Sequence, residues 1–301
     1  MDLMYCVPLL ILGILFQQIA PECQYPSQLK GEWVTSDRGK WTFVNETIVR
    51  GITVDMPGLR TLDFFCIDQV GSTYLLQAVQ FINIFEKITR FFACWNVTEI
   101  SEDVFKYYSE TEYDVFLAEN IFGTVDYIAT LEEACNRRTK PTSSKTFNII
   151  ARKTSLESGM AARKCSMDLR DVFKNVTFMR NGAVCDNVTM DGYRDDRKLM
   201  FASHLTMNGC SSVVLSGEYS CLYHVESEGT TFVSVWHNES YSFSCIAYRK
   251  EGDIIYATWT MMFCSANLSE DDPNYYRRDT SLETEIIFSG SEYAGMIYFA
   301  F

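Results

Sequence analysis

The sequence Cys23-Gln-Tyr-Pro-Ser-Gln-Leu-Lys-Gly-Glu-Trp33 sets the interpretation of the fold. A cysteine, a stiff Tyr25-Pro26 step, Gly31 and the indole of Trp33 follow one another within eleven residues. Proline has a fixed φ angle and favours an extended residue before it, and glycine allows another segment to approach closely. We therefore expect this stretch to lead into the first strand of a β structure, with Pro26, Gly31 and Trp33 as structural anchors.

An apolar leader precedes this stretch. Val7–Phe16 is an uninterrupted run of ten residues without charge, too short to span a bilayer and of the length of a signal-peptide core. Cleavage between Gln18 and Glu22 would release a chain that begins at or near Cys23. We expect residues 1–22 to be a signal peptide and the mature protein to be secreted and extracellular, without a membrane span.

The cysteines agree with this compartment. Of the eleven in the sequence, Cys6 lies in the leader, and the remaining ten form an even set without the closely spaced pairs of a zinc site. We predict five disulfide bonds among Cys23, Cys66, Cys94, Cys135, Cys165, Cys185, Cys210, Cys221, Cys245 and Cys264. Cys23 is expected to bond to Cys94 or Cys135, and the rest of the connectivity stays open.

Six Asn-x-Ser/Thr sequons point the same way. Their number in a chain with a leader favours N-glycosylation over chance occurrence. The expected glycosylation sites are Asn45, Asn96, Asn175, Asn187, Asn238 and Asn267. Because glycans need water, these asparagines are expected on exposed faces or loop tips.

The composition is that of an acidic, well-packed chain. The 301 residues are 47% apolar and 14% aromatic, which is enough for a core and argues against disorder. The formal net charge of −13 argues against a nucleic-acid partner, because such binding depends on basic groups that neutralise phosphates. It also disfavours attraction to anionic lipid.

Strand patterns fill the chain. Short segments rich in β-branched and aromatic residues, bounded by turn residues, indicate an all-β, mainly antiparallel fold in two disulfide-stapled sheet or barrel-like units. Residues 23–135 hold four cysteines and form the first β unit, in which a strand is expected from Trp41 to Val49, closed by Gly51. The polar, basic run 136–146 contains no apolar residue and is expected to be a linker.

The second β unit is expected over residues 147–301, which hold six cysteines. Short aromatic strands predict a sheet or sandwich there. Asn181-Gly182 is a strong hairpin signal between two of these strands. The apolar C-terminal run Ala294–Phe301 is expected to be a final strand.

Two cysteine-bearing hairpins look alike and raise the hypothesis of a duplication. In each, a strand with a cysteine enters a glycine turn and returns with an aromatic residue. The matched positions are Cys66-Ile67, Gly71 and Tyr74 in the first unit and Cys245-Ile246, Gly252 and Tyr256 in the second. A looser echo starts at Cys221. The alternative is that any disulfide-bonded hairpin has this appearance.

These motifs resemble those of a group of secreted invertebrate cysteine-rich proteins of unknown function. The shared opening is a cysteine, an aromatic residue, a proline and a Gly-x-Trp, and the shared later segment is a cysteine-bearing strand with a charged glycine turn. The matching residues are Cys23, Tyr25, Pro26, Leu29, Gly31 and Trp33, then Phe243, Cys245, Lys250, Glu251, Gly252 and Tyr256. The second unit lacks a copy of the opening motif, and the resemblance implies no activity.

A second resemblance is to lipocalins. They place a Gly-x-Trp shortly after the signal peptide, at the start of the first barrel strand, and Gly31-Glu32-Trp33 looks like that motif. The resemblance implies an eight-stranded barrel with the tryptophan at its closed end and room for one small apolar ligand.

No catalytic or metal-binding signature is recognised in the sequence. The nucleophile elbow Gly-x-Ser-x-Gly and the zinc helix His-Glu-x-x-His do not occur. The three histidines, His204, His224 and His237, have no metal-ligand spacing and are expected to be ordinary core or surface residues. The acidic pairs Glu132-Glu133, Asp195-Asp196 and Asp271-Asp272 are expected to be solvated. The acidic turn Glu270-Asp-Asp-Pro is a weak candidate for contact with calcium.

We therefore expect a non-enzymatic secreted glycoprotein without cofactor. Its expected role is structural or adhesive, or that of a binding component, in an extracellular matrix such as a cuticle or shell, with an extracellular protein or matrix polymer as partner. The alternative is a lipocalin-like carrier of a small apolar ligand.

Overall fold

The structure is a computed structural model that describes residues 23–135, 146–203, 216–265 and 284–291, apart from positions 57, 85, 113, 115, 118, 181, 182, 228 and 263. Its described parts are mostly antiparallel strands in two closed eight-stranded barrels, which confirms the all-β prediction. The expected signal peptide, the acidic turn at Glu270, His204, Cys210, Asn267 and the C-terminal run lie outside the described residues.

The first barrel winds up and down from the opening motif. After a 3-10 helix, η1 (Ser27–Leu29), its strands are β1 (Gly31–Thr35), β2 (Gly39–Phe43), β3 (Ile48–Thr53), β4 (Thr61–Val70), β5 (Thr73–Ile84), β6 (Lys87–Ser101), β7 (Val104–Ser109) and β9 (Thr146–Arg152). β9 pairs with β7 on one side and with β1 on the other, and this second pairing closes the barrel. A short strand, β8 (Phe122–Val125), and a helical turn, α1 (Leu131–Ala134), lie outside it and contact β6.

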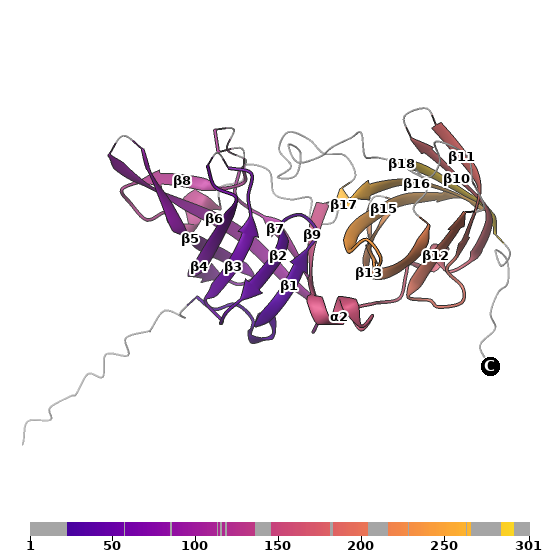
Figure 1. Ribbon diagram of the computed structural model, residues 1–301, viewed down its shortest axis with the longest axis horizontal. Coiled ribbons are helices and arrows are strands. Elements are labelled where there is room, and N and C mark those ends of the chain that lie inside the picture. The colour runs from indigo at the N-terminus through magenta and orange to yellow at the C-terminus, as the bar shows by residue number, and fades with distance from the viewer. Residues whose placement is uncertain are drawn as a thin grey trace, which may run out of the picture.

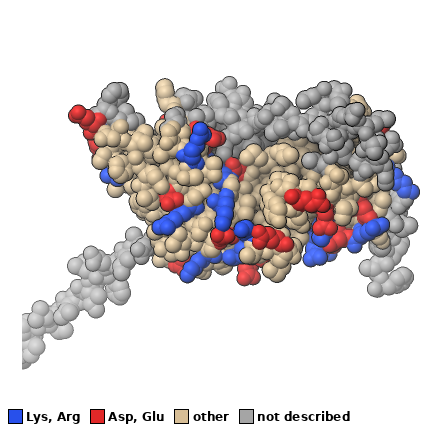
Figure 2. Space-filling model, viewed as in Figure 1, with Lys and Arg blue, Asp and Glu red and all other residues tan. Residues whose placement is uncertain are grey.

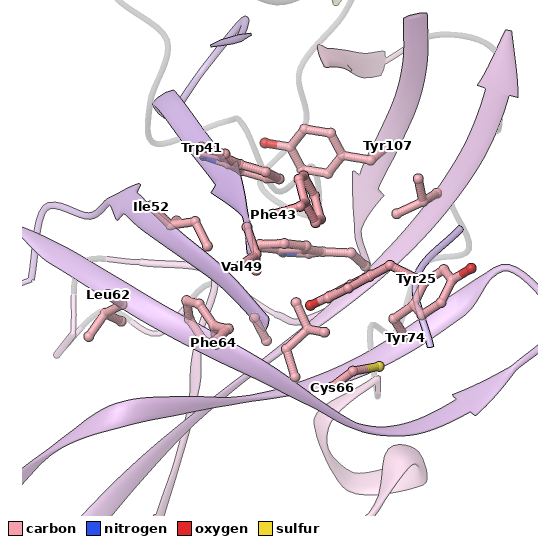
Figure 3. Close-up of a cluster of buried hydrophobic side chains, with 14 of the residues drawn as sticks. Tyr25, Trp41, Phe43, Val49, Ile52, Leu62, Phe64, Cys66, Tyr74 and Tyr107 are labelled. Carbon is pink, nitrogen blue, oxygen red and sulfur yellow. The ribbon is translucent and has the colours of Figure 1, made fainter. Parts of the chain in front are cut away.

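Aromatic side chains fill the first barrel (Figure 3). Trp41 stacks on Trp95 with ring centroids 4.6 Å apart, and Tyr107 packs against both rings. Trp41 and Tyr107 have no exposed surface. In β1, β2 and β4 buried residues alternate with more exposed ones, as closure into a small barrel requires, whereas β7 is buried on both faces.

The second barrel begins after a helical turn, α2 (Lys153–Glu157), and a second 3-10 helix, η2 (Met167–Leu169). Its strands are β10 (Val172–Arg180), β11 (Ala183–Asp191), β12 (Lys198–Ser203), β13 (Gly217–Ser227), β14 (Thr230–His237), β15 (Ser242–Glu251), β16 (Ile254–Met261) and β18 (Thr284–Ser291). Arg180 lies opposite Ala183, so β10 and β11 pair as the expected hairpin requires, and the turn residues Asn181 and Gly182 lie outside the described residues. β18 pairs with both β16 and β10, and the unit is a closed barrel instead of a sandwich.

The barrels lie side by side and share a third apolar core (Figure 1). β7 and β9 contribute from the first barrel and β13, β14 and β15 from the second. Phe147 packs edge to face on Tyr223 at 5.2 Å, and Lys106 Nζ donates to the Tyr223 hydroxyl at 3.2 Å. The two-residue strand β17 (Cys264–Ser265) pairs with β9, so a segment from the second half of the chain extends the sheet of the first barrel.

Three expectations about the first unit are corrected. The unit does not end at 135, because β9, which starts at the end of the expected linker, supplies its closing strand. The strand expected from Trp41 to Val49 is interrupted: the side-chain oxygen of Asn45 accepts from the backbone N–H of Ile48 at 2.8 Å and stabilises a turn. Gly51 does not close a strand but lies inside β3 at an irregularity of the ladder, with φ of 80°.

Four disulfide bonds are described. They join Cys23 to Cys66, Cys94 to Cys135, Cys165 to Cys221, and Cys245 to Cys264. Cys185 is also disulfide-bonded. The prediction that Cys23 bonds to Cys94 or Cys135 was wrong. The backbone at Tyr25 pairs with Glu46 in the β2–β3 turn, and Thr47 of that turn pairs with Cys66, so the opening segment runs beside β4.

The disulfides follow the same pattern in both barrels, which is called their shared disulfide plan below. Cys23 and Cys165 each precede a 3-10 helix and bond to the fourth strand of their barrel, at Cys66 and Cys221. The ladder is irregular directly after both fourth-strand cysteines. The sixth strands carry Cys94 and Cys245, and each bonds to the connection between strands seven and eight. The plan supports a duplication but corrects its register: Cys66 corresponds to Cys221, the looser echo, and not to Cys245.

Candidate functional site

The opening motif forms a packed cap on the first barrel. The indole N–H of Trp33 donates to the Leu29 carbonyl of η1 at 2.5 Å, and the Arg152 guanidinium lies 4.5 Å from the centre of the indole. Arg152 also donates to the carbonyls of Gln28, at 2.6 Å, and Lys30, at 3.2 Å. Gly31 has φ of 118°, a left-handed conformation that favours glycine, beside this guanidinium. These contacts are structural. No motif near Arg152 in the sequence points to its place in the cap, because it lies 119 positions after Trp33.

The corresponding cap of the second barrel is built from other groups. Phe173 lies on the first strand, opposite Ser291, where the first barrel has Trp33 opposite Arg152. The Tyr248 hydroxyl bonds to Ser166 and donates to Asp168 of η2 at 3.2 Å. Burial raises the pKa of Tyr248 to about 12, so the hydroxyl stays protonated at neutral pH.

A buried ionic cluster lies at the opposite end of the first barrel. Arg38 Nη2 bonds to Glu119 at 2.7 Å and Arg38 Nε lies 3.4 Å from Asp37, which accepts from the Tyr107 hydroxyl. Burial alone would lower the pKa of Arg38, but Glu119 and Asp37 raise it, and the guanidinium stays charged. The cluster ties the β1–β2 turn to the segment before β8. No local motif announced it, because its acidic members are 82 positions apart in the sequence.

The core of the second barrel holds polar atoms without partners among the described residues. The Tyr219 hydroxyl and the Trp259 indole N–H are both buried and make no hydrogen bond. Their rings meet edge to face at 4.9 Å. Burial raises the pKa of Tyr219, which keeps it a neutral donor. Each of these donors lacks the acceptor that a buried polar group normally has.

The two described histidines do not converge. His237 is buried, stacks on Tyr219 at 4.4 Å and contacts Ser240 Oγ through Nδ1 at 2.6 Å. On β13, Tyr219 lies opposite His237 and His224 lies opposite Val233. His224 is therefore five residues along the strand from the position that faces His237, a distance of roughly 17 Å. Among the residues that the structure describes, no group of three or more potential metal ligands is found.

The two acidic pairs that the structure describes lie near the surface. Asp195 and Asp196 bind Arg197 and Lys164 in exposed ion pairs, at 3.2 Å and 2.8 Å. Glu133 caps α1 through Thr130. Asp271-Asp272 lies outside the described residues.

The sequons have different surroundings. Asn45, in the β2–β3 turn, and Asn175, on β10, are exposed. Asn96 is half-buried and its amide donates to Thr73 at 3.0 Å, and Asn238 is half-buried beside His237. The side chain of Asn187 is not among those that the structure describes.

Several large apolar side chains are exposed on the outside of the first barrel, on or near β5, β6 and β8. The exposed members are Val79, Phe81, Ile88, Phe116, Val125, Tyr127 and Ile128. Elsewhere acidic and basic residues are interspersed on the face shown in Figure 2. This outer apolar surface is the feature of the described chain best suited to contact another molecule.

Comparison with known proteins gave no relative: the chain matched no protein-family model, no curated protein and no solved structure. None of the helices in the described parts is both long and apolar enough to cross a membrane.

Proposed function

We propose that the protein is a non-enzymatic secreted glycoprotein that binds through its outer surface, as a structural, adhesive or binding component of an extracellular matrix. The observation that carries the proposal is the filling of both barrels by their own aromatic side chains. With the interior occupied, exposed apolar residues of the first barrel are the groups available to a protein or matrix polymer. The four described disulfides suit an oxidising compartment.

The test is expression of the full chain in cells with a secretory pathway. We expect the protein in the medium or the insoluble extracellular fraction, with a smaller mass after N-glycosidase treatment and glycan peptides that contain Asn45 and Asn175. Retention in the cytosol with free thiols would overturn the proposal. Asn175→Gln is the control variant, and it should lose only the glycan attached at position 175.

The second candidate is a carrier of a small ligand, as the lipocalin resemblance suggests. The two buried, unpartnered donors of Tyr219 and Trp259 favour it, because a ligand acceptor would restore their hydrogen bonds. Saturable displacement of a fluorescent lipid from the purified protein would support the carrier and count against the matrix role. Tyr219→Phe should then weaken binding, whereas Tyr256→Phe, a change on the outside of the same barrel, should not.

A further inference from the structure

The β5–β6 hairpin extends beyond the first barrel as an arm, defined here as residues 79–90. β4 pairs with β5 only up to Ala78, whereas β5 continues to Ile84 in its ladder with β6. Beyond Ala78 the backbone N–H of Asp63 in β4 bonds to the side chain of Gln80 and not to the backbone. β5 therefore leaves its neighbour, and the arm projects from the barrel at the upper left of Figure 1.

One edge of this arm is open. Ile84 and Lys87 are the last pair of the ladder and flank a two-residue connection, so they form a hydrogen-bonded pair. Hydrogen-bonded and non-hydrogen-bonded pairs alternate along an antiparallel ladder. The backbone groups of Phe81 and Asn83 therefore point away from β6, and no described residue pairs with them.

The open edge lacks the devices that normally protect a strand. Val79–Ile84 reads Val-Gln-Phe-Ile-Asn-Ile, with no charge, proline or glycine. Val79 is 54% exposed and Phe81 is 57% exposed. In the second barrel, by contrast, β14 pairs with β13 and β15 over nearly its whole length, so the corresponding hairpin has no such edge.

We propose that the open edge of β5 pairs antiparallel with the same edge of a second copy of this chain. An edge of free N–H and C=O groups accepts an extended strand, and this strand is self-complementary because it carries no charge and four of its six residues are apolar. The chain carries a net charge of −13, but in the arm Glu86 is offset by Lys87 and Arg90, so two arms meet without joining negative surfaces. No sequon lies in residues 79–90, and a glycan would not occupy the edge.

The contact is small. Pairing of one short strand with its symmetry mate buries less than the roughly 1,200 Å² of a stable interface, so the dimer forms reversibly with rising concentration. Ile88 lies opposite Asn83 and adds exposed apolar surface on the same face of the arm as Phe81. The self-association involves Val79 and Phe81, which also belong to the outer apolar surface, but it can be measured on the purified chain without any matrix partner.

The test uses the full secreted glycoprotein in sedimentation velocity over roughly 1–300 μM, the range of a weak interface. We expect a monomer at the low end and a dimer at the high end. Phe81→Lys should raise the dissociation constant at least about tenfold, because the symmetric dimer would bury two unpaired ammonium groups, one from each copy. Tyr256→Lys, which places the same charge on an exposed strand residue of the second barrel, should dimerise as the wild type does.

Residue-resolved hydrogen exchange distinguishes edge pairing from other contacts. The amides of Phe81 and Asn83 should exchange rapidly in the monomer and become protected in the dimer, while those of Ile82 and Ile84, already bonded to β6, should be protected in both. A wild type that stays monomeric, a dimer unaffected by Phe81→Lys, or a dimer without new protection at Phe81 and Asn83 would each overturn the proposal.

Discussion

The two barrels share a disulfide plan but hold their corresponding 3-10 helices with different chemistry. In the first barrel an indole and a guanidinium bind η1: Trp33 donates to Leu29, and Arg152 covers Trp33. In the second barrel the Tyr248 hydroxyl and the Lys250 ammonium bind Asp168 of η2, at 3.2 Å and 3.0 Å. The common requirement is a helix docked on the barrel end, and several side-chain sets meet it.

The barrels also differ in how their polar interior groups are satisfied. The first barrel buries a charged cluster, in which Arg38 bonds to Glu119 and Asp37 accepts from Tyr107. Among its described residues the second barrel buries no Asp, Glu, Lys or Arg. Both barrels bury neutral donors that have no described partner, Tyr25 and Trp41 in the first and Tyr219 and Trp259 in the second. The difference teaches that a shared fold and disulfide frame leave the interior chemistry free to diverge, and it allows each contrast to be tested by paired substitutions.

The largest expected effect concerns the caps. Trp33→Ala should lower the free energy of unfolding by ~5 kcal/mol, since it removes a fully buried indole and leaves Arg152 without its ring, whereas Phe173→Ala in the second barrel should cost ~3 kcal/mol. Urea unfolding followed by fluorescence measures both. Equal losses, or a secreted Trp33→Ala variant with an unchanged melting temperature, would remove the special role of the opening motif.

The next contrast concerns the buried charges. Arg38→Met should cost ~3–4 kcal/mol, because it leaves Asp37 and Glu119 buried without their cation. Arg197→Met, which breaks the exposed pair with Asp195, should cost less than ~1 kcal/mol. Thermal unfolding of both variants measures the two losses of stability. A loss of similar size for both would mean that the Arg38 cluster is solvated and does not hold the β1–β2 turn.

The sequence predicts the elements of this fold better than their closure. Alternating apolar residues identify β-strands because each strand buries one face, and Asn181-Gly182 identifies a hairpin because its turn geometry is local. Pairing across long separations leaves no such local signal. The closing role of β9, the Cys23–Cys66 bond and the Arg38–Glu119 contact all depend on which strand ends meet in space.

Two tyrosines test the contrast in hydrogen bonding. Tyr107→Phe in the first barrel should cost ~1.5–3 kcal/mol, because Asp37 loses a buried donor. Tyr219→Phe in the second barrel should change stability by less than ~0.5 kcal/mol, or raise it, because its hydroxyl is buried without a partner. Chemical unfolding at neutral pH provides the comparison. A large loss on Tyr219→Phe in the ligand-free protein would show that the hydroxyl has a partner in solution.

The smallest expected effect is a dependence on pH that belongs to the second barrel alone, since no histidine precedes position 204. Burial lowers the pKa of His237, partly offset by Glu239. Its Nε2 has no partner and faces Gly217, where an added Cβ would lie 2.6 Å away, so a proton on this nitrogen finds no acceptor.

The unfolded chain, in which histidine titrates near pH ~6.5, therefore binds the proton more readily than the folded chain. The stability should be fully present above that value and decrease as the pH falls through it towards the lower folded pKa. Urea midpoints at pH ~7.5 and ~6.0 should differ less for His237→Gln than for the wild type. Burial and Arg170 also lower the pKa of His224, but its side chain is exposed, so His224→Gln should remove the smaller part of the dependence. If both variants behave as the wild type does, the pH response does not arise from the buried histidine and the two barrels do not differ in this respect.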